Sequence, residues 1–321
     1  MNKSKTDLFF SRPKVAIIFA ISLNMLWGSA FPFIKIGYQL FSVNTQSIPS
    51  ILLFAGLRFT ISGIVLLLVG SITQKKLLLL PKGKIGLKIL GLGLLQTTGQ
   101  YMFFYFAVSQ LTGKVGSLLN STTSFTLVIL AHFMYKDTDK LTKRKIIGCI
   151  IGFSGVILAC ISPDNSYTYL GVILMLIASL FFTFSSPANK HICKLADSLT
   201  VSGWNLFFGG FVLLCVGICT GGTVTITNFI AFLDLGVLCF ISSAGYLLNA
   251  ILVKNNPISR IGVFCMCIPI TTSILSAILF PETSSFTITD LLALLLVCIG
   301  IFYVNKPKNP TTNYLYFSTK K

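Results

Sequence analysis

The sequence predicts an all-α membrane protein of ten transmembrane helices, arranged as two inverted five-helix repeats around a central cavity. Three observations lead to this prediction: an apolar composition, the distribution of basic residues and an internal similarity between the two halves. Of the 321 residues, 54% are hydrophobic and 10% are charged, and the mean hydropathy is +0.85. Soluble domains carry about 25% charged residues, so a bilayer is the predicted solvent.

Ten apolar runs account for the predicted helices. The hydrocarbon core of a bilayer is about 30 Å thick, and about 20 mostly apolar helical residues cross it. Backbone polar groups inside lipid need internal partners, which favours helices. The runs are 15–37, 48–71, 85–108, 112–134, 146–162, 169–189, 199–220, 229–252, 259–280 and 287–305. The first apolar run follows basic residues, as the apolar run of a secretory signal does. Its length and the further runs after it predict a permanent helix instead.

The basic residues predict the orientation. Of 25 Lys and Arg residues, 22 fall in the N-terminal segment, the even-numbered loops and the C-terminal tail. Short cytoplasmic loops carry this excess, so both termini are expected on the cytoplasmic side of the plasma (cell inner) membrane and the number of spans is even. The +17 net charge is therefore explained by topology. Nucleic-acid binding is not expected, because the charges are dispersed and form no basic motif.

The two halves resemble each other. Residues 57–70, LRFTISGIVLLLVG, align with residues 204–217, WNLFFGGFVLLCVG, and SFTLVILAHFMYKD from Ser124 aligns with PITTSILSAILFPE from Pro269. Each half holds five predicted spans, so the second half runs opposite to the first, an arrangement found in many transporters. The predicted organisation is a cytoplasmic segment at 1–14, repeats at 15–162 and 163–305, and a cytoplasmic tail at 306–321.

Metal and cofactor chemistry is not expected. Eight of the nine cysteines lie inside apolar runs, where they behave as small apolar residues, and the chain has two histidines. The eight acids are placed in loops or at helix ends, so no carboxylate is expected at the membrane midplane, where a proton relay usually needs one. These acids are Asp7, Asp137, Asp139, Asp164, Asp197, Asp234, Glu282 and Asp290.

Arg58 is the outstanding polar residue of the predicted helices. About ten helical residues at 1.5 Å each place it roughly 15 Å below the outer boundary. A charge at this depth costs several kcal/mol unless it faces a cavity or a partner. Two interpretations stay open: a binding or gating cation in a cavity, and a structural arginine bonded to the backbone. Lys35, near the outer end of the first helix, is expected to extend its ammonium to the interface.

Other polar side chains either line a cavity or join helices through hydrogen bonds of about 1 kcal/mol. The segment NSTTS at 120–124 is denser in polar atoms than helix pairing needs. The predicted substrate-binding residues are Asn24, Trp27, Arg58, Gln100, Asn120, Trp204, Asn205 and Tyr246.

Several motifs carry a family resemblance. The stretch LWGSAFPFIK at 26–35, GLRF around Arg58 and the block from FYFAVSQLTG through residue 158 are similar to the EamA branch of the drug/metabolite transporter superfamily. The resemblance covers residues 15–305 and implies ten helices, inverted repeats, a central cavity and efflux. The chain departs from the family pattern where Ser124 stands opposite Pro269 and where Asp137 or Asp139 replaces a Gly-Glu pair.

The expected function is alternating-access transport of a small metabolite, such as an amino acid or a related polar or amphipathic solute, by a monomer or homodimer in the lipid bilayer. Arg58 favours a substrate with a carboxylate, because a guanidinium repels cations. Two alternatives stay open: an integral-membrane enzyme acting on a lipid, and a membrane assembly subunit that transports nothing.

Overall fold

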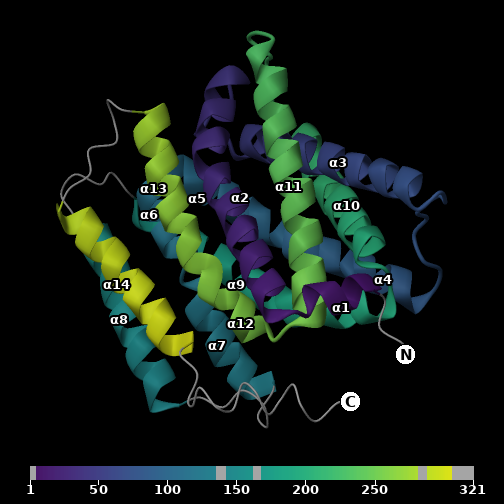
Figure 1. Cartoon of the computed structure of the whole chain (residues 1–321). Helices are drawn as coiled ribbons and strands as arrows, with labels where there is room; N and C mark the ends of the chain where they lie inside the picture. The colour runs from purple at the N-terminus through teal and green to yellow at the C-terminus, as the bar shows by residue number, and fades with distance from the viewer. Residues whose placement is uncertain (1–4, 135–141, 162–167, 281–287, 306–321) are drawn as a thin grey trace.

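The computed structural model describes residues 5–134, 142–161, 168–280 and 288–305, and all the regular structure within these ranges is helical (Figure 1). The helices of the first half are α1 (Lys5–Phe10), α2 (Pro13–Leu40), α3 (Ile48–Thr73), α4 (Lys84–Leu92), the π-helix η1 (Gly93–Gly99), α5 (Gln100–Gln110), α6 (Gly113–Asn120), α7 (Thr123–Met134) and α8 (Lys143–Ile161). Those of the second half are α9 (Tyr169–Leu195), α10 (Ser198–Cys219), α11 (Ile230–Asn255), α12 (Ile258–Gly262), the 3₁₀-helix η2 (Val263–Met266), α13 (Cys267–Leu279) and α14 (Ile288–Asn305).

Six helical stretches of the described residues are long and apolar enough to cross a membrane, which confirms the prediction of an all-helical membrane protein. They are Pro13–Leu40, Ile48–Thr73, Gly113–Met134, Tyr169–Leu195, Ser198–Cys219 and Ile230–Asn255. Other predicted spans are divided into shorter helices. The run expected at 85–108 is built from α4, η1 and α5, and the run expected at 259–280 from α12, η2 and α13.

Hydrogen bonds join distant loops at each end of the bundle. At one end, which we call the neutral end, the amides of Thr225 and Thr227 donate to the carbonyls of Phe41 (2.9 Å) and Leu40 (3.1 Å). The segments 41–47 and 220–229 at this end contain no Lys or Arg.

The opposite end, which we call the basic end, carries the lysine-rich segments. Lys254 forms an ion pair with Asp7 at 3.0 Å, and the side-chain amide of Asn256 donates to the carbonyl of Phe10 at 3.1 Å. Gln74 donates to Asp197 at 3.1 Å, which ties the loop after α3 to the start of α10. The basic residues thus gather at one end of the bundle, as the sequence predicts.

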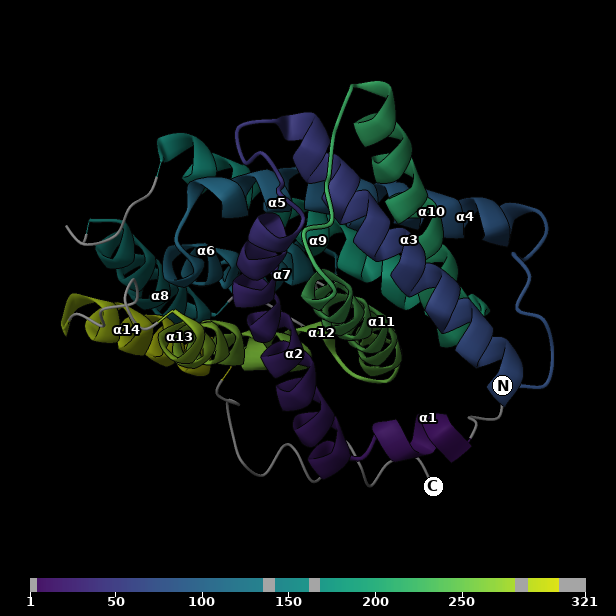
Figure 2. The same ribbon diagram turned by 90° about the horizontal axis from the view of Figure 1, so that it is seen from above.

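Helices α3 and α10 pack closely along their length and lie side by side in both views (Figure 1, Figure 2). Each carries a glycine every seven residues, at 56, 63 and 70 in α3 and at 203, 210 and 217 in α10. A side chain at Gly63 would meet the backbone of Phe207, and one at Gly210 would lie 2.5 Å from the backbone nitrogen of Thr60. Small residues let membrane helices approach to backbone contact, so this glycine repeat sets the separation of α3 and α10.

We expect Gly63→Ala to lower the stability of the protein by about 1–3 kcal/mol, because the added methyl group forces two packed backbones apart. Gly236→Ala in α11 is the matched control, since a Cβ at that position meets nothing within 4 Å. The measurement is the thermal unfolding midpoint of the detergent-solubilised protein. Equal midpoints for the two variants would contradict the close packing of α3 against α10.

Candidate functional site

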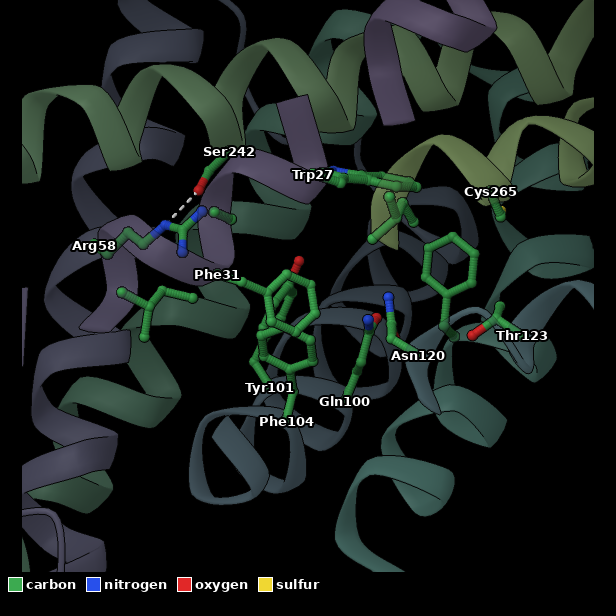
Figure 3. Close-up of a pocket in the computed structure, with 14 residues that line it drawn as sticks. Trp27, Phe31, Arg58, Gln100, Tyr101, Phe104, Asn120, Thr123, Ser242 and Cys265 are labelled. Carbon is green, nitrogen blue, oxygen red and sulfur yellow. Dashed lines mark hydrogen bonds between the residues drawn. The ribbon is translucent and has the colours of Figure 1, made fainter. Parts of the chain in front are cut away.

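A cavity of about 40 Å³, measured as the space open to the centres of water-sized spheres, lies between helices of both halves (Figure 3). At about 10–15 Å³ per water, it holds two to four water molecules. Arg58 of α3 lies at one end of the view, and Thr123 of α7 and Cys265 of η2 lie at the other. Five of the 14 residues that line the cavity are aromatic: Trp27, Phe31, Tyr101, Phe104 and Phe182.

The Arg58 side chain is 2% exposed and bonds to two neighbouring helices. Its Nε donates to Ser242 Oγ (2.8 Å) and to the carbonyl of Leu238 (3.1 Å), both on α11, and its Nη1 donates to Tyr105 Oη (2.7 Å) on α5. The guanidinium carbon also lies 5.0 Å from the centre of the Phe59 ring, within the range of a cation–π contact. Within the described residues, no ion pair joins Arg58 to a carboxylate, so the hydrogen bonds of its positive charge go to neutral acceptors beside the cavity.

Tyr105 positions the guanidinium. Its side chain is fully buried, and its own backbone carbonyl accepts a 2.8 Å hydrogen bond from the hydroxyl of Tyr38 on α2. The Tyr105 ring also packs edge-on against Phe54 and Phe59 of α3. A single aromatic cluster therefore joins α2, α3 and α5 around the charge.

Two carboxamides lie across the cavity from Trp27. The side chains of Gln100 on α5 and Asn120 on α6 both point toward the Trp27 side of the cavity (Figure 3). The side-chain oxygen of Gln100 is buried and has no hydrogen-bond partner. An unpaired buried acceptor costs about 1–3 kcal/mol, so it marks a position where a donor from a ligand or water fits.

Trp27 forms one wall of the cavity. Its ring meets Phe182 of α9 edge-on, with centroids 5.5 Å apart. The indole Nε1 has no hydrogen-bond partner and faces α11, where a side chain at Gly245 would lie 2.6 Å from it. Glycine at 245 is therefore required for the ring to reach this place.

The NSTTS segment divides its polar groups between the backbone and the cavity. The hydroxyls of Ser121 and Thr122 donate to the carbonyls of Leu118 and Leu119, each at 2.6 Å, where α6 ends. Asn120 and Thr123 line the cavity. Hydrogen bonds from a hydroxyl to a carbonyl three residues earlier compete with the backbone hydrogen bonds of a helix, which explains why the helix is interrupted between α6 and α7.

Four of the eight predicted binding residues, Trp27, Arg58, Gln100 and Asn120, line the cavity together. Asn205 and Tyr246 lie outside its lining and bond to the π-helix η1. Asn205 donates to Gln96 Oε1 and accepts from Thr97 Oγ1, both at 2.8 Å, and Tyr246 Oη lies 3.2 Å from Thr97 Oγ1. Their polar groups join α10 and α11 to the first half of the chain.

Asn24 and Trp204 also lie outside the cavity lining. The Asn24 side chain is buried and donates to the carbonyl of Ala20 at 2.7 Å, which leaves its oxygen without a partner. The indole of Trp204 donates to the carbonyl of Leu78 at 3.0 Å and so fastens the loop between α3 and α4 at the basic end.

Two charged side chains lie outside the cavity lining. The ammonium of Lys35 is not free, because it donates to the carbonyl of Leu111 at 2.6 Å. Asp234 lies near the start of α11 but is only 5% exposed, and neither of its carboxylate oxygens has a hydrogen-bond partner. Acids Asp137, Asp139, Asp164 and Glu282 lie outside the described residues.

Comparison with known proteins gives one consistent result. The model of the EamA-like transporter family matches residues 14–161 and 169–306. The uncharacterized transporter YvbV of Bacillus subtilis is 26% identical over 298 residues, which are 92% of each chain. Protein PecM of Dickeya dadantii is 25% identical over 226 residues, or 68% of this chain and 69% of PecM. A solved crystal structure at 13% identity has a TM-score of 0.66 and covers 94% of this chain and 99% of its own, so the two share a fold.

We expect Tyr105→Phe to lower the free energy of unfolding by about 1–3 kcal/mol, because the buried Nη1 of Arg58 then loses its acceptor. Tyr303→Phe is the control, since the Tyr303 hydroxyl makes no hydrogen bond within the described part of the chain. Chemical denaturation in detergent, followed by tryptophan fluorescence, measures both variants. A Tyr105→Phe protein as stable as the Tyr303→Phe protein would remove Tyr105 from the set that holds the charge.

Proposed function

This chain belongs to the EamA-like transporter family, and we propose that it carries a small carboxylate-bearing metabolite, an amino acid or a close relative, across the plasma membrane. The observation that supports this substrate class best is the Arg58 guanidinium at the cavity, which has no carboxylate partner within the described residues. A buried cation with fixed hydrogen bonds attracts an anion and repels a cation. The unpartnered Gln100 oxygen offers an acceptor for the ammonium of the same substrate.

We propose ten spans in two inverted repeats. The glycine repeat supports this arrangement, because the three glycines of α3 and the three of α10 are each separated by 147 residues. The cavity lining supports it too. Asn120 and Cys265 are 145 residues apart, and both line the cavity. Thr123 and Ile268 are also 145 residues apart, and both line it. Positions that the repeat makes equivalent therefore line the same cavity, which supports a site on a pseudo-twofold axis.

A pair of lysines gives further support. Lys35 follows Pro32 by three residues and donates to the carbonyl of Leu111 at 2.6 Å. Lys190 follows Pro187 by three residues and donates to the carbonyl of Asn256 at 2.7 Å.

The two acceptors also correspond. Leu111 ends α5 with φ −127° and ψ 153°, and Asn256 ends α11 with φ −128° and ψ 160°. Lys35 lies five residues before the neutral-end residue Leu40, whereas Asn256 bonds to Phe10 at the basic end. The same bond thus occurs at opposite ends of the bundle, which fits an inverted repeat.

The small cavity fits a closed form of the transporter. Space for a few waters does not admit an amino acid with its side chain, so helices that line the cavity must move apart during transport. We propose that substrate enters from one end while the other is shut, and that the basic end faces the cytoplasm because short cytoplasmic loops carry the lysine excess. Efflux is the proposed direction, in keeping with the family resemblance of the motifs around Trp27 and Arg58.

A ligand screen tests the proposed substrate class. Amino acids, organic acids, sugars, nucleosides and organic cations are added to the detergent-solubilised protein, and the thermal unfolding midpoint is measured. We expect stabilisation by carboxylate-bearing compounds, by about 2.7 kcal/mol at 100 times the Kd, because a ligand that binds the folded state stabilises it. We expect Arg58→Gln to abolish the effect and Lys88→Gln, an exposed basic residue of α4, to keep it. Stabilisation only by cations, or stabilisation unchanged in Arg58→Gln, would refute the proposal.

A labelling experiment tests the proposed orientation. Cys219 ends α10 near the neutral end and is exposed. A membrane-impermeant maleimide is expected to label it in intact cells, and Cys219→Ser to remove that label. Lys76→Cys, made in the Cys219→Ser background, is expected to react only after the membrane is permeabilised. The opposite pattern would show that the basic end faces outward.

A further inference from the structure

Asp234 is an ionisable group that the transport site described above does not use. Its side chain is 95% buried on α11, and both carboxylate oxygens lack a hydrogen-bond partner. Residues 229, 230, 232 and 233 around it are large, apolar and more than half exposed, as expected on a lipid-facing surface. Buried acids are normally paired or hydrogen-bonded, so an unpaired one inside a lipid-facing helix points to function.

The surroundings of the carboxylate are tight and mostly apolar. A side chain at Gly37 of α2 would lie 2.9 Å from Asp234 Oδ2 and 2.5 Å from the Phe54 ring of α3. The segment 220–229, which leads into α11, has no ionisable side chain. The buried carboxylate therefore lies against Gly37, next to an aromatic ring of α3.

Arg58 is the charged group that bonds to the same face of α11 on which Asp234 lies. Residues 234, 238 and 242 follow one face of α11 at helical spacing, and Arg58 bonds to the second and third of them, through the carbonyl of Leu238 and the hydroxyl of Ser242. Asp234 lies four residues, about 6 Å along the axis, from Leu238 toward the neutral end. The nearby ionisable groups on the helices around Asp234 already form other hydrogen bonds. Tyr38 donates to the Tyr105 carbonyl, Tyr105 accepts from Arg58, and Cys239 donates to the Arg58 carbonyl. Lys35, two residues before Gly37, donates to Leu111.

We propose that Asp234 is a proton-binding site whose occupancy is controlled by the charge of Arg58. The ionised carboxylate offsets the guanidinium, and the protonated acid leaves it as a net positive charge. A substrate carboxylate at Arg58 replaces the negative charge that Asp234 supplies, so anion binding and proton binding favour each other. Where the proposed carboxylate transport holds, the substrate therefore moves together with one proton.

A proton fits this site better than a metal cation does. Sodium or another hard cation requires several oxygen ligands. Among the described residues no polar group bonds to either carboxylate oxygen of Asp234, and Gly37 and the Phe54 ring pack beside it. The guanidinium one turn away also repels a second cation. A proton needs one carboxylate oxygen and no further ligands.

The test is an infrared pH titration of the purified protein without any substrate, so its outcome does not depend on whether the transport proposal holds. A carboxylic acid that is protonated in an apolar site gives a C=O stretching band separate from ionised acids. We expect such a band in the unmodified protein, its loss in Asp234→Asn and its retention in Asp197→Asn, an acid exposed at the start of α10. We expect the band of Arg58→Gln to persist to higher pH, because removal of the positive charge favours the protonated acid. Replacing potassium by sodium is expected to leave the band unchanged.

Three results would overturn the proposal: no such band at any pH that the protein tolerates, a band that survives in Asp234→Asn, or a pH range that Arg58→Gln leaves unchanged. A band displaced by sodium would instead identify a metal site and refute the assignment to a proton. Should Asp234→Asn fail to fold, Asp234→Glu provides the second variant. It keeps the acid and is expected to shift the frequency of the band.

Discussion

A single buried positive charge constrains the arrangement of the first half against the second. Placing a guanidinium inside a bilayer costs several kcal/mol unless its N–H groups are bonded. Here the bonds go to α11 and α5, and an aromatic cluster with α2 holds Tyr105 in place. Helix α3 in turn packs on α10 through glycines, which leaves its Arg58 face free to meet α11. The bonds that satisfy the charge therefore join α3 to α5 and α11 at this point.

The sequence predicted an all-helical membrane protein and four of the 14 residues that line the cavity, because both depend on local properties. Apolar runs identify the spans, and the depth of Arg58 follows from counting residues along α3. The sequence could not show that Asn205 and Tyr246 would bond to Gln96 and Thr97, because that pairing depends on how α10 and α11 pack against η1. It also did not indicate the burial of Asp234. A carboxylate near a helix start looks the same in sequence whether its side chain faces lipid, water or another helix.

The two halves contribute different chemistry to the cavity. Where the first half presents Asn120 and Thr123 to the cavity, the second presents Cys265 and Ile268. Trp27 faces Phe182 in the same way. Polar groups therefore gather on the side formed by the first half, while the second half supplies mostly apolar wall and, from α11, Ser242 as a partner of Arg58. This asymmetry gives a bound substrate a fixed orientation, which two identical halves could not provide.

The lysine bonds show how such a structure could open at one end only. In this closed form, Lys35 holds the end of α5 at the neutral end, and Lys190 holds the end of α11 at the basic end. Opening either end breaks one ammonium–carbonyl bond and leaves the other intact. The bonds have the same type and nearly the same length, so neither opening is strongly favoured by them. In the transport proposed above, the balance between the two openings would be set by what occupies the cavity. A bound carboxylate and a proton would then change that balance through the charges of Arg58 and Asp234.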